Sequence, residues 1–521
     1  MRDFFRATVR NNQHVLWLAV LSGAVSIGWF FLDGHVDINL ADEGQLWYGT
    51  QAVRLGQIPV RDFQSYDPGR YLWTGAWSYL LGDGLVSLRL ACVLFQCLGV
   101  LAGLLATRRL SRNWLFLVGV ALLLCAWMHP RYKVFEQSVA LMAIYAGILL
   151  LERPSLRRHW WVGVFGGLVA FIGCNHGAYH VLAFGLLITW SSWDAGWRPW
   201  LRRCLVWGTG LLIGYLPQWL LFVFVHGYFH EYVAYVKLVL FHGTNLAKPV
   251  PWPWALDTSQ SFSGPMSAAV EGCYYILFPA FFILVAVRAW QLGRAGFGAR
   301  AALVAATCVT LPYTHYVFSR PDIVHLGHGA PALALGLIAL GFTFGGRMVK
   351  PGYVLATILM VSSFLANLAQ FGVTTQVTAP PDSLFPMEVK GQQMLVRLYF
   401  AKALASANYL ARNLAKPEEP IFFMPLPGLY PFTERISPTK RLQFTYPSPE
   451  EDRNLLTEIE SADVEWVMLQ NYAFDGREDL RFSNANPRVF EYFAQNFTQV
   501  RVATLPGDMV ILRRRRPDRA Q

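Results

Sequence analysis

Long apolar runs alternate with short polar segments over the first 371 residues of the chain. About eleven of these runs are long enough to cross a hydrocarbon core of roughly 30 Å, although Gly and Pro break several of them. We expect membrane-spanning helices at residues 15–33, 84–106, 113–128, 135–151, 160–175, 178–193, 204–225, 268–288, 301–317, 326–344 and 351–371. The pattern predicts an α-helical polytopic membrane protein.

The pattern changes after Phe371, where a segment of ordinary polarity follows a Pro-containing linker. Short apolar runs predict strands at 421–424, 466–470 and 510–513, and helical periodicity predicts helices at 449–461 and 487–496. This alternation is typical of a small α/β domain. We therefore expect a transmembrane domain at residues 1–371 and a separate extracytoplasmic domain at 380–521.

Two loops of the transmembrane domain are unusually long, at residues 34–83 and 228–267. Both mix amphipathic segments with Trp, Tyr and Pro, and such segments can lie in the membrane interface. In the second loop Tyr232, Val236, Val239 and Leu240 recur at helical spacing, which predicts an interfacial helix.

Composition agrees with a membrane protein, since 54% of the residues are hydrophobic, only 15% are charged and the mean hydropathy is +0.33. Lys and Arg gather in alternate loops, which places the N-terminus and these loops in the cytoplasm. The acidic residues before Pro380 fall mostly in the opposite loops, so we expect the working face to be the outer one. The net charge of +11 comes from the membrane domain and its inner loops, where basic residues can contact anionic lipid head groups. It therefore requires no nucleic-acid partner.

All seven cysteines fall within apolar runs, without disulfide or metal-ligand spacing. Basic residues precede the first run but no small-residue cleavage site follows it, so we expect a retained helix. The run Arg513 to Arg516 is interpreted as a charged strand end, with contact to lipid phosphate as the alternative. The sequence holds no Gly-rich phosphate loop, serine-nucleophile signature or zinc motif, so no nucleotide cofactor is expected.

The first long loop opens with the acidic pair Asp42-Glu43 and continues through a GxxP stretch and the segment Tyr66-Asp67-Pro68. With about eleven spans, an interfacial helix and a C-terminal outer domain, this arrangement resembles the GT-C glycosyltransferases, such as the protein O-mannosyltransferases and the lipid A aminoarabinose transferases. The resemblance covers nearly the whole chain, and its sharpest motif is the loop that begins at Asp42.

The resemblance implies that Asp42 is catalytic, with Glu43 as its helper, and that the donor is a polyprenyl-phosphate-linked sugar transferred with inversion. Such a transfer needs a base near the acceptor, cations on the leaving phosphate and an apolar groove for the lipid. The alternative is that the two acidic residues cap an interfacial helix beginning near Gln45.

Several other polar residues of the expected outer loops are candidates for substrate contacts. Asp67 and Arg70 are candidates to bind sugar hydroxyls or phosphate, or else form an ion pair within the loop. His176 lies in the polar stretch 175–180, which we expect to form a hairpin lining a cavity, with a structural histidine as the alternative. Lys248 is a candidate for the donor phosphate.

Arg131 and Lys133 lie in a short loop close to the membrane and are further candidates for the donor phosphate, unless they are cations extending from a helix end. Glu136 is a candidate for the second acidic site of several GT-C enzymes, some of which use a metal. The family's usual acidic pair is absent from this loop, so the need for a divalent metal is left open.

The segment from Ser319 to His328 is the second strongest signal. Arg320 suits a multi-donor contact with the donor phosphate, and His325 is a further donor to it. Asp322 is a substrate-site candidate that can orient either of them. The alternative is a purely structural pair of Arg320 with Asp322.

We therefore expect a glycosyltransferase of a bacterial inner or plasma membrane, with its active site on the outer face. It would transfer a sugar from polyprenyl phosphate to a glycan, lipid or protein acceptor during assembly of cell-envelope glycoconjugates. The rival hypotheses are a lipid or glycolipid transporter, for which we see no internal repeat, and a noncatalytic glycolipid-binding protein.

Overall fold

The computed structural model describes residues 2–242, 248–255, 263–344, 351–380, 383–444 and 447–515. The chain divides into two compact units, which are described separately. The first comprises Met1–Gly34, Arg89–Phe224 and Ala247–Val377, and the second comprises His35–Leu88, Val225–Leu246 and Thr378–Gln521. The second unit thus joins the first long loop to the C-terminal chain. The domain boundary expected from the sequence remains a prediction.

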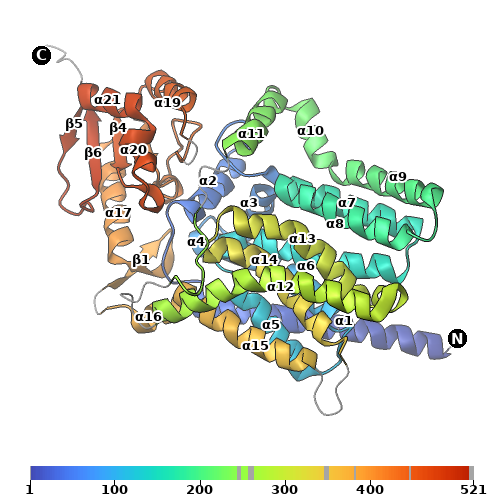
Figure 1. The fold of residues 1–521 in the computed structure, drawn as a ribbon. Coiled ribbons are helices and arrows are strands. Elements are labelled where there is room, and N and C mark those ends of the chain that lie inside the picture. The colour runs from blue at the N-terminus through green and yellow to red at the C-terminus, as the bar shows by residue number, and fades with distance from the viewer. Residues whose placement is uncertain are drawn as a thin grey trace, which may run out of the picture. The chain divides into compact units, whose positions relative to one another are not determined.

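The first unit is helical, and its helices α7, α8, α13 and α14 run side by side in Figure 1. Its elements are α1 (Arg2–Asp33), α4 (Leu85–Thr107), α5 (Trp114–Trp127), η1 (Arg131–Lys133), α6 (Val134–Glu152), α7 (Leu156–Ile172), α8 (Cys174–Ser192), α9 (Trp197–Gly214), α10 (Leu216–Phe224), α12 (Ser263–Gly298), α13 (Ala301–Ser319), α14 (Ile323–Gly341), α15 (Pro351–Ala366), η3 (Leu368–Gln370) and α16 (Gly372–Thr378).

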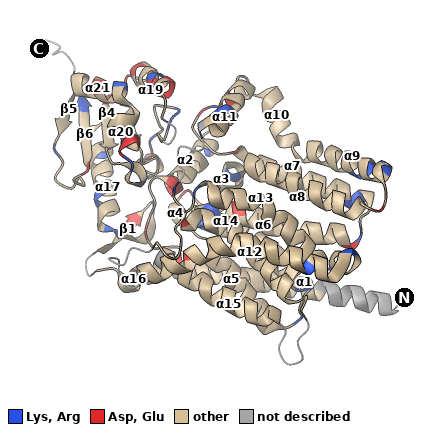
Figure 2. Ribbon diagram, viewed as in Figure 1, with Lys and Arg blue, Asp and Glu red and all other residues tan. Residues whose placement is uncertain are grey.

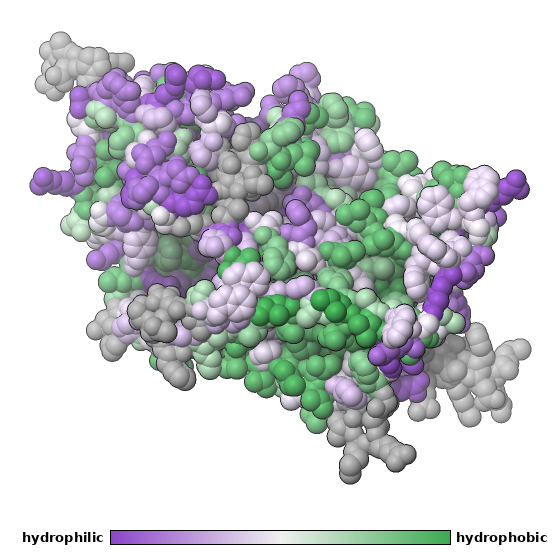
Figure 3. Space-filling model, viewed as in Figure 1, coloured by the Kyte–Doolittle hydropathy of each residue, from purple (hydrophilic) through white to green (hydrophobic). Residues whose placement is uncertain are grey.

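Six helices of the described chain are long and apolar enough to cross a membrane, and α9 with α10 makes a seventh if this pair, bent by 51°, is one span. The helices α5 and α15 are apolar but shorter. A multi-pass membrane protein is therefore confirmed, whereas a count of about eleven spans is not. Apolar side chains cover the surface over α12 and α15 in Figure 3, and basic residues lie near one end of α9 in Figure 2.

The expected hairpin at residues 175–180 is wrong, because these residues form the first turns of α8. The break lies at Gly173, whose extended backbone separates α7 from α8. The polar side chains, including His176, therefore project from a helix that begins at Cys174.

Glycines bring α7 and α9 into close contact. Gly163 and Gly210 face each other, and a Cβ on either would overlap a backbone carbonyl oxygen of the other helix. Gly167 and Gly214 repeat this contact one turn further along. Such small-residue crossings let helix backbones approach within a membrane, where the hydrophobic effect does not drive helix association.

The second unit combines helices with two small sheets. Its elements are α2 (Asp42–Arg54), α3 (Pro68–Leu81), α11 (Tyr228–His242), β1 (Leu384–Val389), β2 (Gln392–Arg397), α17 (Leu398–Tyr409), η4 (Leu410–Leu414), β3 (Ile421–Met424), α18 (Leu429–Thr433), α19 (Pro449–Ser461), β4 (Trp466–Gln470), η5 (Phe474–Gly476), η6 (Glu478–Leu480), α20 (Phe482–Ala485), α21 (Pro487–Asn496), β5 (Phe497–Val500) and β6 (Met509–Arg514). A helix in the second long loop, three strands and two C-terminal helices are present as expected from the sequence, while the interfacial position of α11 remains a prediction.

The larger sheet has the order β3-β4-β6-β5, in which β3 and β4 are parallel and the other pairs are antiparallel. Phe422 pairs with Val467, and both side chains are buried together with Leu455 of α19 and Phe493 of α21. The alternation of short apolar strands with amphipathic helices thus encloses one hydrophobic core.

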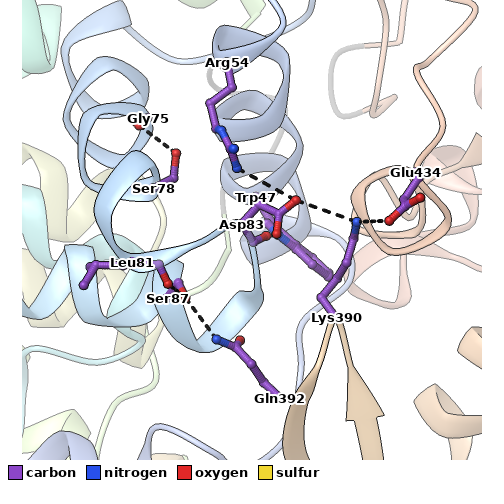
Figure 4. Close-up of polar contacts among 10 residues, drawn as sticks. All are labelled: Trp47, Arg54, Gly75, Ser78, Leu81, Asp83, Ser87, Lys390, Gln392 and Glu434. Carbon is purple, nitrogen blue, oxygen red and sulfur yellow. Dashed lines mark hydrogen bonds and ion pairs between the residues drawn. The ribbon is translucent and has the colours of Figure 1, made fainter.

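The hairpin β1–β2 is attached to the end of the first long loop (Figure 4). Lys390 lies in its turn and contacts Glu434 at 2.7 Å and Asp83 at 3.8 Å. Gln392 accepts a hydrogen bond from the Val86 backbone N–H at 2.9 Å and donates one to the Ser87 hydroxyl at 3.0 Å. The contacts of Lys390 with Asp83 and of Gln392 with Val86 and Ser87 connect residues that are more than 300 positions apart.

Candidate functional site

The connection between α13 and α14 holds three of the predicted site residues. Pro321 disfavours a helical conformation at Arg320, which ends α13. Asp322 then caps α14, since its side chain accepts a hydrogen bond from the His325 backbone N–H at 2.9 Å. The local sequence therefore places Arg320, Asp322 and His325 around a single turn.

Asp322 contacts both of its predicted partners. Its carboxylate lies 2.8 Å from His325 Nδ1 and 3.3 Å from Arg320 Nε, and the three side chains are 17–23% exposed. Burial alone would raise the pKa of Asp322, but the hydrogen bonds and charge of His325, with the charge of Arg320, lower it overall. Asp322 is therefore ionised at neutral pH and holds the Arg320 and His325 side chains in place.

Aromatic and histidine rings pack beside this turn. The centroid of the Tyr316 ring lies 5.6 Å from that of His325, 4.7 Å from that of His328 and 5.7 Å from that of His176. His176 Nδ1 also lies 3.1 Å from the Tyr313 hydroxyl. We call these five residues the histidine–tyrosine cluster. Aromatic faces suit stacking against a sugar, and imidazole groups can donate to or accept from its hydroxyls.

Glu136 lies against the same cluster in the first turn of α6, and Lys133 directly precedes this helix. The Tyr313 hydroxyl donates to the Glu136 backbone oxygen at 3.5 Å. Both Lys133 and Glu136 are buried. The first unit thus brings together six predicted residues, which are listed here: Lys133, Glu136, His176, Arg320, Asp322 and His325.

Arg131 lies in a different buried group. Its guanidinium contacts the Asp33 carboxylate at 3.0 Å and donates to the Trp29 backbone oxygen at 3.2 Å. His129 Nδ1 lies 3.6 Å from the same carboxylate, and the Trp29 indole N–H donates to His129 Nε2 at 2.9 Å. The structure therefore supplies Arg131 with a partner inside the bundle, and its contact with a donor phosphate stays a prediction.

The second unit contains the acidic pair at the start of α2. This helix begins at Asp42 rather than near Gln45, and the Asn39 side chain accepts hydrogen bonds from the N–H groups of Ala41 and Asp42 at 3.0 and 2.9 Å. Glu43 is buried, whereas Asp42 is half-buried. Both carboxylates stand in the first helical turn, where the helix dipole favours negative charge.

Asp67 and Arg70 belong to the start of α3 in the same unit. The Tyr232 hydroxyl of α11 donates to the Asp67 carboxylate at 3.2 Å, and the Arg70 guanidinium lies 4.8 Å from the centre of the Tyr66 ring. Both side chains are buried. Asp67 therefore connects the first long loop to α11, whereas Arg70 contacts its own loop.

Lys248 is half-buried and belongs to the first unit, whereas Arg516 lies outside the described residues. The described residues contain no group of three or more His, Cys, Asp or Glu side chains placed to hold a metal ion. Metal binding by Glu136 remains a prediction.

Several residues of these groups were not singled out from the sequence. Asp33 contacts His129, which lies 96 positions later in the chain. The Tyr275 hydroxyl donates to the Asp322 backbone oxygen at 3.2 Å. A signal for Asp33 exists, since an acidic residue directly ends the first apolar run. His328 ends the segment singled out from the sequence but was given no role there, and Tyr316 carries no such signal, because aromatic residues are common in apolar helices.

Comparison with known proteins gives a distant structural match. Neither a protein-family model nor a curated protein sequence matches the chain. ArnT from Cupriavidus metallidurans in the apo state is similar with 16% identity and a TM-score of 0.42, over 97% of this chain and 98% of that chain. The same protein bound to undecaprenyl phosphate has 14% identity and a TM-score of 0.43, over 95% and 97%.

ArnT is a lipid A aminoarabinose transferase of the GT-C type, which is the family that the sequence resembles.

Proposed function

We propose that this chain is an integral-membrane GT-C glycosyltransferase of a bacterial inner membrane. It transfers a sugar from a polyprenyl-phosphate donor to a glycan, lipid or protein acceptor on the outer face of that membrane. The observation that carries the proposal is the turn at Asp322, where one ionised carboxylate holds Arg320 and His325 beside the aromatic rings of the histidine–tyrosine cluster. Cations beside stacked rings suit a sugar phosphate.

The reaction is a displacement at the anomeric carbon. The acceptor nucleophile attacks this carbon, and its proton passes to the Asp42 carboxylate, with Glu43 as helper. The bond between the anomeric carbon and the phosphate oxygen breaks, and the polyprenyl phosphate leaves with the electron pair. Attack opposite the leaving group inverts the anomeric centre.

Cationic groups stabilise the phosphate charge that develops as this bond breaks. We assign this role to Arg320, His325 and Lys133, with Asp322 holding the first two in position. The other predicted contacts are listed here: Lys248 and Arg131 for the phosphate, and Asp67, Arg70 and His176 for the sugar.

The test measures two properties of each variant. Binding of undecaprenyl phosphate is measured on the detergent-purified protein, and transfer of labelled sugar is measured in membranes. We expect Arg320→Ala to weaken binding of undecaprenyl phosphate by about 10- to 100-fold, because a charge-assisted hydrogen bond contributes roughly 1.5–3 kcal/mol. Arg294→Ala is the control, since its guanidinium forms an exposed pair with Asp194. Asp42→Asn should keep this binding and lower transfer of labelled sugar by about 10²- to 10⁴-fold.

The transfer assay offers a panel of undecaprenyl-phosphate-linked pentoses, aminopentoses and hexoses to membranes, and follows the label into lipid, glycan and protein. Equal binding by Arg320→Ala and wild type would contradict the phosphate assignment. Movement of an intact labelled glycolipid across vesicles, without cleavage, would instead identify a transporter. Binding with neither transfer nor movement would identify a noncatalytic protein.

A further inference from the structure

One face of α2 is attached to the C-terminal chain within the second unit. Gly44 lies directly against Gly428, and a Cβ added to Gly44 would overlap the backbone nitrogen and Cα of Gly428. The Gly428 N–H donates to the Leu40 backbone oxygen at 2.9 Å, two residues before Asp42. A backbone-to-backbone contact therefore lies within two residues of the acidic pair.

Tyr48 makes a second contact on the same face, one turn after Gly44. Its hydroxyl accepts a hydrogen bond from the Ser437 N–H at 3.2 Å, and its ring packs against Tyr430 with centroids 5.4 Å apart. The side chain is 2% exposed, and burial is the largest cause that raises the pKa of its hydroxyl to about 12. Tyr48 is thus neutral and fully enclosed.

Gln64 extends the attachment beyond α2. Its side-chain oxygen accepts hydrogen bonds from the backbone N–H groups of Leu442 and Gln443 at 2.9 and 2.8 Å. The Gln64 backbone N–H donates to the Lys440 backbone oxygen at 2.7 Å. Gln45 of α2 donates in turn to the Gln64 backbone oxygen at 3.3 Å. We call residues 426–443, which make all these contacts, the α2 support segment.

Two further residues of α2 contact Asp83, at the end of the first long loop (Figure 4). The Trp47 indole N–H donates to the Asp83 backbone oxygen at 2.8 Å, and Arg54 lies 3.8 Å from the Asp83 carboxylate. A helix of 13 residues is marginal by itself in water, so these tertiary contacts determine where its first turn lies.

We infer that the α2 support segment is a positioning element for Asp42, and that Gly428 and Tyr48 are its positioning residues. The inference rests on the proposed function, because it takes Asp42 as the base. A misplacement of about 1 Å, caused at a distance from the reacting atoms, can cost roughly 10²-fold in rate. The C-terminal chain thereby belongs to the catalytic apparatus and is more than a cover for it.

Gly428→Val and Tyr48→Phe test the two contacts separately. Gly428 has an ordinary helical φ of −63°, so valine acts there through its contact with α2 and not through backbone strain. Tyr48→Phe removes only the hydroxyl. Gly507→Val and Tyr79→Phe are the matched controls, since an added Cβ at Gly507 meets nothing within 4 Å and Tyr79 is exposed.

We expect Gly428→Val to lower kcat by at least about 10-fold and Tyr48→Phe by a few-fold, with the KM for donor and the binding of undecaprenyl phosphate unchanged. Both controls should transfer as the wild type does. Wild-type kcat in both test variants would overturn the inference. Equal losses in kcat and donor binding would also overturn it, because they would indicate a general structural role.

A second measurement places each substitution in the Asp42→Asn background. If the support segment acts through Asp42, Gly428→Val and Tyr48→Phe have no further effect on the residual rate, because residues that act as a unit are not additive. Additive losses would overturn the inference. If Asp42→Asn itself transfers normally, the proposed role of Asp42 fails, whatever the support segment does. Tyr48→Phe keeps the test decisive if Gly428→Val does not fold.

Discussion

Two Asp–Arg–His groups in the first unit use the same residue types in different surroundings. In one, Asp33 contacts Arg131 and His129, and all three side chains are at most 7% exposed. In the other, Asp322 contacts Arg320 and His325, and the exposure is 17–23%. The first group joins distant parts of the chain, whereas the second spans a single turn between consecutive helices.

The difference indicates separate tasks. A buried ion pair pays a large desolvation cost and is strongly destabilising to break, which suits a group that fixes α1 to the start of α6. A partly exposed group keeps its Arg and His nitrogens where a solute can reach them. The difference in exposure thus predicts a stabilising group at Asp33 and a binding group at Asp322. The same substitution, Asp to Asn, in each group distinguishes these two roles.

Asp33→Asn should give the largest effect on stability. The substitution leaves the Arg131 guanidinium buried beside a neutral amide, and removal of one partner from a buried pair costs about 3–5 kcal/mol. The Gly372 N–H would also lose the charge of its acceptor, since it donates to the Asp33 carboxylate. Unfolding of the purified protein in mixed micelles, titrated with SDS, measures this loss.

The control for this prediction is Asp194→Asn, whose carboxylate pairs with Arg294 but is 83% exposed. Exposed pairs contribute roughly 0–1 kcal/mol, so this variant should unfold as the wild type does. A loss at Asp33 no greater than the loss at Asp194 would show that the buried group does not stabilise the bundle.

The pH dependence of stability sharpens the comparison, with a smaller effect. Burial is the largest cause that lowers the pKa of His129, to about 4, assisted by Arg131 and opposed by Asp33. Between about pH 6.5 and 4 the unfolded chain therefore binds a proton that the folded chain does not. The contribution of His129 to the free energy of unfolding is fully present above about pH 6.5. The free energy of unfolding falls by about 3 kcal/mol as the pH drops to 4.

His129→Gln should remove this part of the acid limb, whereas replacement of the exposed His230 by Gln should leave the limb intact. SDS titrations between pH 4.5 and 7.5 measure both slopes. A His129→Gln variant whose stability falls with pH as steeply as the wild type would mean that His129 does not cause the dependence.

Most of the secondary structure could be predicted from the sequence, because local patterns determine it. The short strands at Ile421 and Trp466 and the helix at Tyr228 lie where apolar runs and helical spacing predict them. The expected hairpin at 175–180 is wrong because polar residues can also occupy the first turns of a helix. The backbone break belongs to Gly173, and the polar residues occupy the first turns of a helix.

The candidate site divides in the same way into local and distant contacts. The pairing of Asp322 with His325 follows from a three-residue spacing at a helix start, so the sequence predicts it. The approach of His176 to Tyr316, 140 positions away, depends on the packing of α8 against α13 and leaves no mark in either segment. The partner of Asp33 was unpredictable for the same reason.

Asp322→Asn should give the smallest effect on stability, below about 1 kcal/mol. Asparagine caps a helix about as well as aspartate, so the hydrogen bond from the His325 N–H to the side chain is kept. The loss is confined to the charge that orients Arg320 and His325, whose side chains are 21% and 17% exposed and therefore better screened by water than those around Asp33. The same SDS titration should therefore barely separate this variant from wild type, while undecaprenyl phosphate binding weakens because Arg320 is no longer held. A stability loss as large as that of Asp33→Asn would make the two groups equivalent and remove the reason to assign the phosphate to Asp322's neighbours.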